Sequence, residues 1–188
     1  MELISMAPLC YISSTFSDLK HERKLVFDWL AKQTRSYTPV NSETSSPHPA
    51  LHTCFHDIEK CDIYILLLGA RYGTIPDNQY GENLSYTHHE FRHAKKLGKQ
   101  CYAFQMEASK YYAKITAKDM KKRDKFWEEI KEYVTPVIVS ADKLIDQLST
   151  SLNKYAHGSF EEGISGLVPR PPLNESAQVD PLADRHKP

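Results

Sequence analysis

The stretch that decides the fold class is Leu9-Cys-Tyr-Ile-Ser-Ser-Thr-Phe-Ser-Asp-Leu-Lys-His-Glu-Arg23. An apolar segment of strand length runs into a hydroxyl-rich turn, and the turn runs into a charged segment with the periodicity of a helix. Such a βα junction directs side chains and the N–H groups of the helix start toward the carboxyl edge of a sheet, where open α/β folds place ligands. The stretch therefore predicts an α/β fold and the edge at which a binding site lies.

The rest of the chain repeats this alternation of strand-like and helix-like segments. Strands are expected at residues 9–14, 36–43, 62–68, 100–105 and 136–140, and helices at 19–33, 51–60, 87–97, 109–133 and 141–155. Gly98 is expected to end the third of these helices. Helices between successive strands imply a five-stranded parallel sheet with right-handed crossovers.

The composition fits one ordinary globular domain. The 188 residues carry 24 basic and 24 acidic side chains, a formal net charge of +0, so we expect no direct nucleic-acid partner and no binding to membrane surfaces. Balanced charge also leaves self-association unopposed. There is no signal peptide pattern and no apolar run of bilayer-spanning length, which predicts a cytoplasmic protein. The cysteines (Cys10, Cys54, Cys61 and Cys101) lack CxxC spacing and are expected to be buried thiols.

The composition changes near Gly158, where Gly, Pro, Ser and Asp residues replace the apolar periodicity. We therefore expect a domain at residues 1–157 and a flexible linker at residues 158–188. A linker of this kind suggests that a further domain follows in a longer protein.

Three polar segments are candidates for the site. In the first, the hydroxyls of Ser13, Ser14 and Thr15 are placed to bind ligand hydroxyls or phosphates. The alternative is that Thr15, Ser17 or Asp18 only caps the following helix.

The second candidate segment, residues 69–73, follows the most apolar strand. Gly69 allows close approach of a ligand, Arg71 offers a planar cationic group, and Tyr72 offers a ring for stacking. In the alternative interpretation, Arg71 pairs with Glu22 and Tyr72 packs under the loop.

The third segment, Ser85-Tyr-Thr-His-His-Glu-Phe91, contributes Glu90 as the candidate catalytic acid, with the hydroxyls of Ser85 and Thr87 as ligand contacts. A carboxylate here suits a ribose hydroxyl or positive charge at an anomeric carbon. The alternative is a capping box, in which Thr87 caps the helix and Glu90 reaches back to its start. His89 and His93 have metal-ligand spacing but no evident third ligand, so no metal site is predicted.

At these residues the chain resembles a TIR-like family long catalogued as a domain of unknown function, whose members sit N-terminal to STAND-type (NACHT and related) NTPases. The resemblance covers roughly residues 9–105 and includes Tyr11-Ile-Ser-Ser-Thr-Phe-Ser-Asp-Leu with Glu22-Arg23, Cys61-Asp-Ile-Tyr64, Leu68-Gly-Ala-Arg-Tyr-Gly73, and the segment around Glu90. The linker residues Gly166-Leu-Val-Pro-Arg-Pro-Pro172 resemble the passage into a following NTPase. One departure is His88, which stands where the family's pattern has an acid.

The resemblance implies a flavodoxin-like, three-layer sandwich related to TIR domains and nucleoside deoxyribosyltransferases. It implies an effector or signalling domain for antiviral, innate-immune defence, which cleaves NAD at the nicotinamide–ribose bond when a STAND NTPase sensor clusters copies into a homo-oligomer. Glu90 occupies the position of the catalytic glutamate of such enzymes. NAD would be the substrate, and no cofactor is implied. Two alternatives stay open: a non-catalytic oligomerisation or adaptor domain, and a hydrolase or transferase acting on another nucleoside.

Overall fold

The structure, a computed structural model, describes residues 7–33, 36–40, 51–76, 82–107 and 115–161. It contains the predicted five-stranded sheet, all parallel, with the order β2-β1-β3-β4-β5. The strands are β1 (Leu9–Ser14), β2 (Thr38–Pro39), β3 (Ile63–Leu68), β4 (Gln100–Met106) and β5 (Val137–Val139). In this flavodoxin-like order, the winding reverses between β1 and β3, and ligands of such folds bind outside the carboxyl ends of these two strands.

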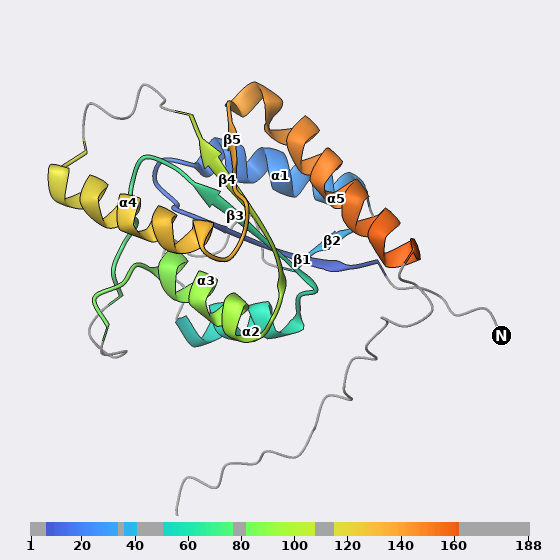
Figure 1. Ribbon diagram of the computed structural model, residues 1–188, viewed down its shortest axis with the longest axis horizontal. Coiled ribbons are helices and arrows are strands. Elements are labelled where there is room, and N and C mark those ends of the chain that lie inside the picture. The colour runs from blue at the N-terminus through green and yellow to red at the C-terminus, as the bar shows by residue number, and fades with distance from the viewer. Residues whose placement is uncertain (1–6, 34–35, 41–50, 77–81, 108–114, 162–188) are drawn as a thin grey trace, which may run out of the picture. The chain divides into compact units, whose positions relative to one another are not determined.

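Helices lie on both faces of the sheet (Figure 1), which confirms the three-layer α/β prediction. α2 and α3 lie on one face, and α1 and the first turns of α5 lie on the other. The helices are α1 (Lys20–Lys32), α2 (Leu51–Lys60), α3 (Tyr86–Lys96), α4 (Ala117–Lys131) and α5 (Leu144–Glu161), the last preceded by a 3-10 turn at Ala141–Lys143.

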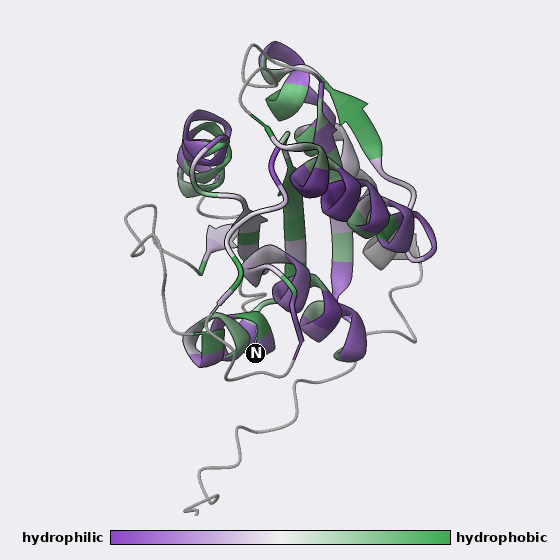
Figure 2. Cartoon of the chain, turned by 90° about the vertical axis from the view of Figure 1, so that its left-hand side faces the viewer, coloured by the Kyte–Doolittle hydropathy of each residue, from purple (hydrophilic) through white to green (hydrophobic). Residues whose placement is uncertain are grey.

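The alternation of side chains along the strands separates two apolar layers. All residues of β3 are buried, and the hydrophobic colour of the central strands is visible in Figure 2. On one face Tyr64 joins a buried cluster with Phe91 of α3 and Phe126 of α4. Its neighbour Ile65 points the opposite way, toward the layer in which Val26 of α1 is fully buried. A strand buried on both faces is typical of the centre of a parallel sheet.

Two predicted elements are shorter than expected. β2 contains only Thr38–Pro39, and residues 41–43 of the predicted strand lie outside the described residues. The N–H groups of Thr38 and Val40 both donate to the chain at β1, so Pro39 is tolerated because its nitrogen faces the free edge of the sheet. α4 begins at Ala117 rather than at residue 109. Thr116 has extended backbone angles, and its hydroxyl accepts a hydrogen bond from the Asp119 N–H at 3.1 Å. This N-cap fixes the start of the helix, and residues 109–114 are not described.

The last helix is longer than predicted. α5 continues to Glu161, past Gly158 where the linker was expected to begin. A glycine costs a helix about 1 kcal/mol, and an established helix extends through it because each added residue contributes one hydrogen bond. The remaining residues of the predicted linker, 162–188, lie outside the described part of the chain. The prediction for Gly98 is confirmed by its left-handed φ of +66° directly after α3.

Candidate functional site

The Glu90 carboxylate lies on the inner face of α3 and is held by β1. It is only 7% exposed. The Tyr11 hydroxyl donates a hydrogen bond to Glu90 Oε1 at 2.9 Å, and the Ser13 hydroxyl donates to Oε2. Tyr11 and Ser13 are two residues apart on one strand and therefore face the same side of the sheet. Both oxygens of the carboxylate thus have a partner on β1.

The capping-box interpretation of Glu90 is wrong. The N-cap of α3 is Ser85, whose hydroxyl accepts a hydrogen bond from the His88 N–H at 3.3 Å. Thr87 lies inside the first turn, two residues too late to cap the helix. Because the cap is formed without it, the side chain of Glu90 is free to turn toward the sheet.

The groups around Glu90 are held in their protonated forms. Burial raises the pKa of Tyr11 and Tyr64 well above the usual range, and the negative charge of Glu90 raises both further. Burial, followed by the same charge, raises the pKa of the Cys54 thiol to about 12. The carboxylate is therefore surrounded by neutral donors rather than by competing anions.

A half-buried arginine of α1 lies at the end of β1. Arg23 Nη1 donates to the Ile12 carbonyl at 2.6 Å, and it lies 3.4 Å from the Ser14 hydroxyl. Two residues earlier, the Cys10 carbonyl accepts from the Val40 N–H beside β2. Alternate carbonyls of a strand point the same way, so Arg23 takes the place that a longer β2 would fill.

The charge of Glu90 also affects the pKa of Arg23. Burial lowers the pKa of Arg23, and the charge of Glu90 opposes that effect. Neither Arg23 nor Tyr11 was predicted from the sequence to be a site residue. The period of two along β1 was the available signal for Tyr11, since it places Tyr11 beside Ser13. No sequence signal showed that Arg23 would reach back to β1.

Asp18 joins the turn after β1 to the loop after β3. Its carboxylate accepts from the Thr15 hydroxyl through Oδ1 and from the Arg71 N–H through Oδ2, the latter at 2.9 Å. A Cβ on Gly69 would lie 2.5 Å from Asp18 Oδ2, so the absence of a side chain at Gly69 is what admits this contact. The N-cap position of α1 is Leu19, which has no side-chain cap.

The alternative that Thr15, Ser17 or Asp18 caps α1 is therefore wrong. Thr15 instead packs against the loop after β3, because a Cβ on Gly73 would lie 3.1 Å from the Thr15 methyl group and 3.4 Å from Ser85 Cβ. Gly73 has a φ of +97°, which favours glycine. The three predicted segments thus meet at one place, with Gly73 between the other two.

Arg71 and Tyr72 differ in their surroundings. The Arg71 side chain is exposed, and among the described residues it forms no ion pair with Glu22 or any other acid. Tyr72 is 2% exposed and packs edge-to-face against Phe126. The interpretation that Tyr72 packs under its loop is therefore confirmed, and its ring offers no free face for stacking.

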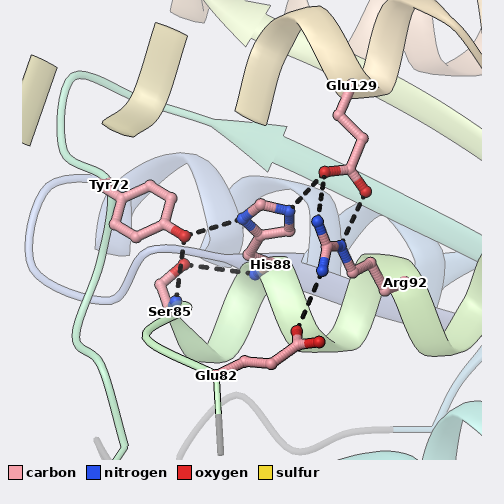
Figure 3. Close-up of polar contacts among 6 residues, drawn as sticks. All are labelled: Tyr72, Glu82, Ser85, His88, Arg92 and Glu129. Atoms are coloured by element: carbon pink, nitrogen blue, oxygen red, sulfur yellow. Dashed lines mark hydrogen bonds and ion pairs between the residues drawn. The ribbon is translucent and has the colours of Figure 1, made fainter. Parts of the chain in front are cut away.

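Tyr72 belongs to a polar network between α3 and α4 (Figure 3). Its hydroxyl lies 2.8 Å from His88 Nδ1, and it accepts from the Ser85 N–H at 3.3 Å. His88 Nε2 lies 2.9 Å from Glu129 Oε2, and Arg92 donates to both oxygens of Glu129 at 2.9 Å.

The charges of this network follow from its contacts. The Arg92 hydrogen bond is the main cause that lowers the pKa of Glu129 to about 2. Burial lowers the pKa of His88, although the bond to Glu129 opposes this effect. A neutral His88 then accepts a hydrogen bond from the Tyr72 hydroxyl at Nδ1 and donates a hydrogen bond to Glu129 from Nε2. His88 is thus a structural link between α3 and α4.

No group of three or more His, Cys, Asp or Glu side chains in the described ranges has the geometry of a metal site. No helix in the same part of the chain is long and apolar enough to cross a bilayer.

The sequence comparisons identify a family. The chain matches the profile described as "Domain of unknown function (DUF4062)" over residues 10–153. No curated protein matches the chain. The matched span includes β1, β3 and α3, and so contains Glu90 and all of its hydrogen-bond partners. Since it covers well over half of the sequence, the chain belongs to the DUF4062 family.

Proposed function

We propose that this domain hydrolyses the N-glycosidic bond between nicotinamide and ribose in NAD. The observation that carries the proposal is the Glu90 carboxylate, which is held by Tyr11 and Ser13 beside the carboxyl end of β1 instead of capping its own helix. This position adjoins the β1/β3 crossover, where flavodoxin-like folds bind nucleotides.

The chemistry requires an ionised carboxylate with acceptor capacity to spare. A carboxylate offers about four lone-pair sites, and the two hydroxyls from β1 use one on each oxygen. The remaining sites suit ribose hydroxyls, and the negative charge stabilises the oxocarbenium-like transition state. The C–N bond breaks with its electron pair going to nicotinamide, water adds at the ribose carbon, and one proton is released. No metal is required, because nicotinamide leaves as a neutral molecule.

The other predicted contacts are assigned according to their exposure and partners. Ser14, the half-buried last residue of β1, is proposed to contact the ribose or phosphate oxygens. Thr15 is buried and donates to Asp18, so it is proposed to hold the turn instead of touching NAD. Arg71, exposed on the loop after β3, is proposed to bind the diphosphate. Ser13 acts through Glu90 rather than on the ligand directly. Tyr72, Ser85 and Thr87 are buried and are proposed to shape the loop instead of touching NAD.

The biological role proposed is that of a cytoplasmic effector in antiviral or innate-immune defence. A STAND-type NTPase, in the same chain or complex, would cluster several copies and thereby activate NAD cleavage. The resemblance to TIR-like domains supports this role, and the neutral formal charge of the chain is compatible with self-association.

Nicotinamide release tests the enzymatic part. The domain is fused to a trimeric coiled coil to cluster it, mixed with NAD, and followed by chromatography. We expect release by the wild type and a loss of about 100-fold or more in Glu90→Gln. Glu107→Gln, which changes an exposed carboxylate after β4, should retain full activity. Equal rates for the two variants would overturn the proposal.

A non-catalytic adaptor domain is the second candidate, because β5 lies at an edge of the sheet and Ile138 on this strand is 66% exposed. An exposed apolar side chain on an edge strand favours association with another chain. If no clustered form releases nicotinamide while wild type self-associates in sedimentation experiments and Ile138→Lys does not, the adaptor function replaces the enzymatic one. A panel of other nucleosides, assayed in parallel, tests the remaining alternative.

A further inference from the structure

We infer that Tyr11 is a positioning residue that sets the orientation of the Glu90 carboxylate for the reaction. This inference rests on the proposed function, since it assigns a role within the same site. Tyr11 would not touch NAD. It would act through its hydroxyl, which donates to Glu90 Oε1 at 2.9 Å.

The two hydroxyls on β1 fix the carboxylate plane together. Tyr11 binds one oxygen and Ser13 the other, and both residues are almost completely buried. A carboxylate held through a single oxygen can still rotate about its terminal bond, where the torsional wells are broad. A carboxylate held through both oxygens presents its remaining lone pairs in one direction, which is what a bound ribose requires.

The ring of Tyr11 is itself held in place. It stacks on the ring of Tyr64, the residue paired with it in the adjacent strand β3, with centroids 5.9 Å apart and planes inclined by 6°. Tyr64 also contacts the ring of Phe91, one residue after Glu90 in α3. The tyrosine that orients the carboxylate is therefore fixed by the sheet, and the same packing fixes the helix that carries the carboxylate.

The direction of the hydrogen bond is also determined. Burial and the charge of Glu90 keep Tyr11 protonated, so its hydroxyl donates and the carboxylate accepts. A donated hydrogen bond stabilises the ionised form of a carboxylate over its protonated form. Tyr11 therefore supports the orientation that the proposed reaction needs.

Tyr64 provides a matched control. Its ring is buried beside that of Tyr11, but its hydroxyl interacts with the Ser13 hydroxyl and does not donate to Glu90. Tyr11→Phe and Tyr64→Phe each remove one buried hydroxyl from the same stacked pair and leave the rings intact. Only the first removes a donor to Glu90.

The experiment measures kcat and KM of nicotinamide release for the two variants in the clustered form. For Tyr11→Phe we expect kcat to fall about tenfold to a hundredfold, with KM little changed. Tyr64→Phe should lower kcat far less, because the donor to Glu90 stays in place. Equal losses of kcat in both variants, or a loss that appears only in KM, would reduce Tyr11 to a packing residue.

Failure of the proposed function has a different signature. If wild type and Glu90→Gln release nicotinamide equally slowly, the reaction is not NAD hydrolysis by Glu90. Crystal structures of wild type and Tyr11→Phe then decide the inference separately. Rotation of the Glu90 carboxylate in the variant would show that Tyr11 positions it, and an unchanged carboxylate would show that it does not.

Discussion

The Glu90 carboxylate is tolerated in a buried position because both of its oxygens accept hydrogen bonds, which offset the cost of removing it from water. Removing one donor leaves a buried charge with an unsatisfied oxygen, which costs more than the loss of an exposed hydrogen bond. The stability of this domain should therefore depend on polar side chains at the end of β1 as well as on its apolar core.

Ser13 and Ser14 allow this dependence to be measured with neighbouring residues. Ser13→Ala should lower the free energy of unfolding by about 1–3 kcal/mol, since its buried hydroxyl donates to Glu90. Ser14→Ala should change it by less than about 0.5 kcal/mol, because its only described hydrogen bond, with Arg23, is 3.4 Å long. Urea denaturation of both variants provides the comparison. Similar values would mean that the Ser13–Glu90 contact contributes little.

The Glu129 carboxylate should make the free energy of unfolding depend on pH in the acidic range. Its pKa is lowered from 4.5 to about 2 in the folded chain, mainly by Arg92. A carboxyl group with a lowered folded pKa contributes stability above its unfolded pKa. That contribution is lost as the pH falls from about 4.5 toward 2.

Urea denaturation at a series of pH values tests this expectation. Glu129→Gln should show a weaker dependence than wild type below about pH 4.5. Glu128→Gln removes an adjacent carboxylate that is exposed and paired with Lys131, and it should follow the wild-type curve. If all three proteins lose stability in parallel, Glu129 is not the group responsible.

At the scale of the element, the packing of the turns against one another determines where the candidate site lies. Gly73 contacts residues from two other loops, whereas Gly98 would meet nothing within 4 Å if it carried a Cβ. Both have a positive φ, +97° and +66°. The two glycines therefore separate the effect of backbone strain from that of packing between loops.

Alanine at each position tests that separation. Gly98→Ala should lower the free energy of unfolding by about 1 kcal/mol through strain alone. Gly73→Ala should cost more, toward the upper part of the range of about 1–3 kcal/mol, because Thr15 and Ser85 must also move. Thermal unfolding followed by circular dichroism measures both. A smaller loss in Gly73→Ala would mean that the loops adjust freely.

The sequence predicted the elements better than their caps and partners. Hydrophobic periodicity located β1, β3 and α3 to within a residue or two, because burial imposes that pattern directly. The start of α3 was misassigned because Ser85 and Thr87 are both residues that cap helices, and Thr87 was chosen for its spacing from Glu90 although serine is the stronger N-cap. The pairing of Glu90 with Tyr11 joins residues 79 positions apart, and a tyrosine within a strand reads as an ordinary core residue.

At the scale of the whole molecule, connectivity predicted a parallel sheet, and the flavodoxin-like strand order was expected from the family resemblance. Right-handed crossovers and helices between strands restrict a parallel sheet to few orders, and the observed order is one of the commonest. The partners of the arginines could not be predicted in this way. A long flexible side chain can reach several neighbours. Arg23 bonds the Ile12 carbonyl of β1, whereas the side chain of Arg71 is exposed.

The extent of the folded unit can be tested by shortening the chain. The family match ends at residue 153 and α5 ends at Glu161. A chain of residues 1–161 should therefore unfold at the same temperature as the full chain. A chain of residues 1–143 lacks Leu144 and Leu148, which are fully buried, and it should be insoluble or unfolded because it exposes one face of the sheet. Differential scanning fluorimetry and expression tests distinguish these outcomes.

The contact between Arg23 and the Ile12 carbonyl places a side chain, instead of a neighbouring strand, along the last part of β1. Strands bound only to other strands move as one unit, since shifting one of them breaks a whole ladder. Here, among the described residues, the final part of β1 is bounded on one side by a single guanidinium. That side can open by rotation of one side chain, whereas on the other side Ser13 and Ser14 stay paired with β3.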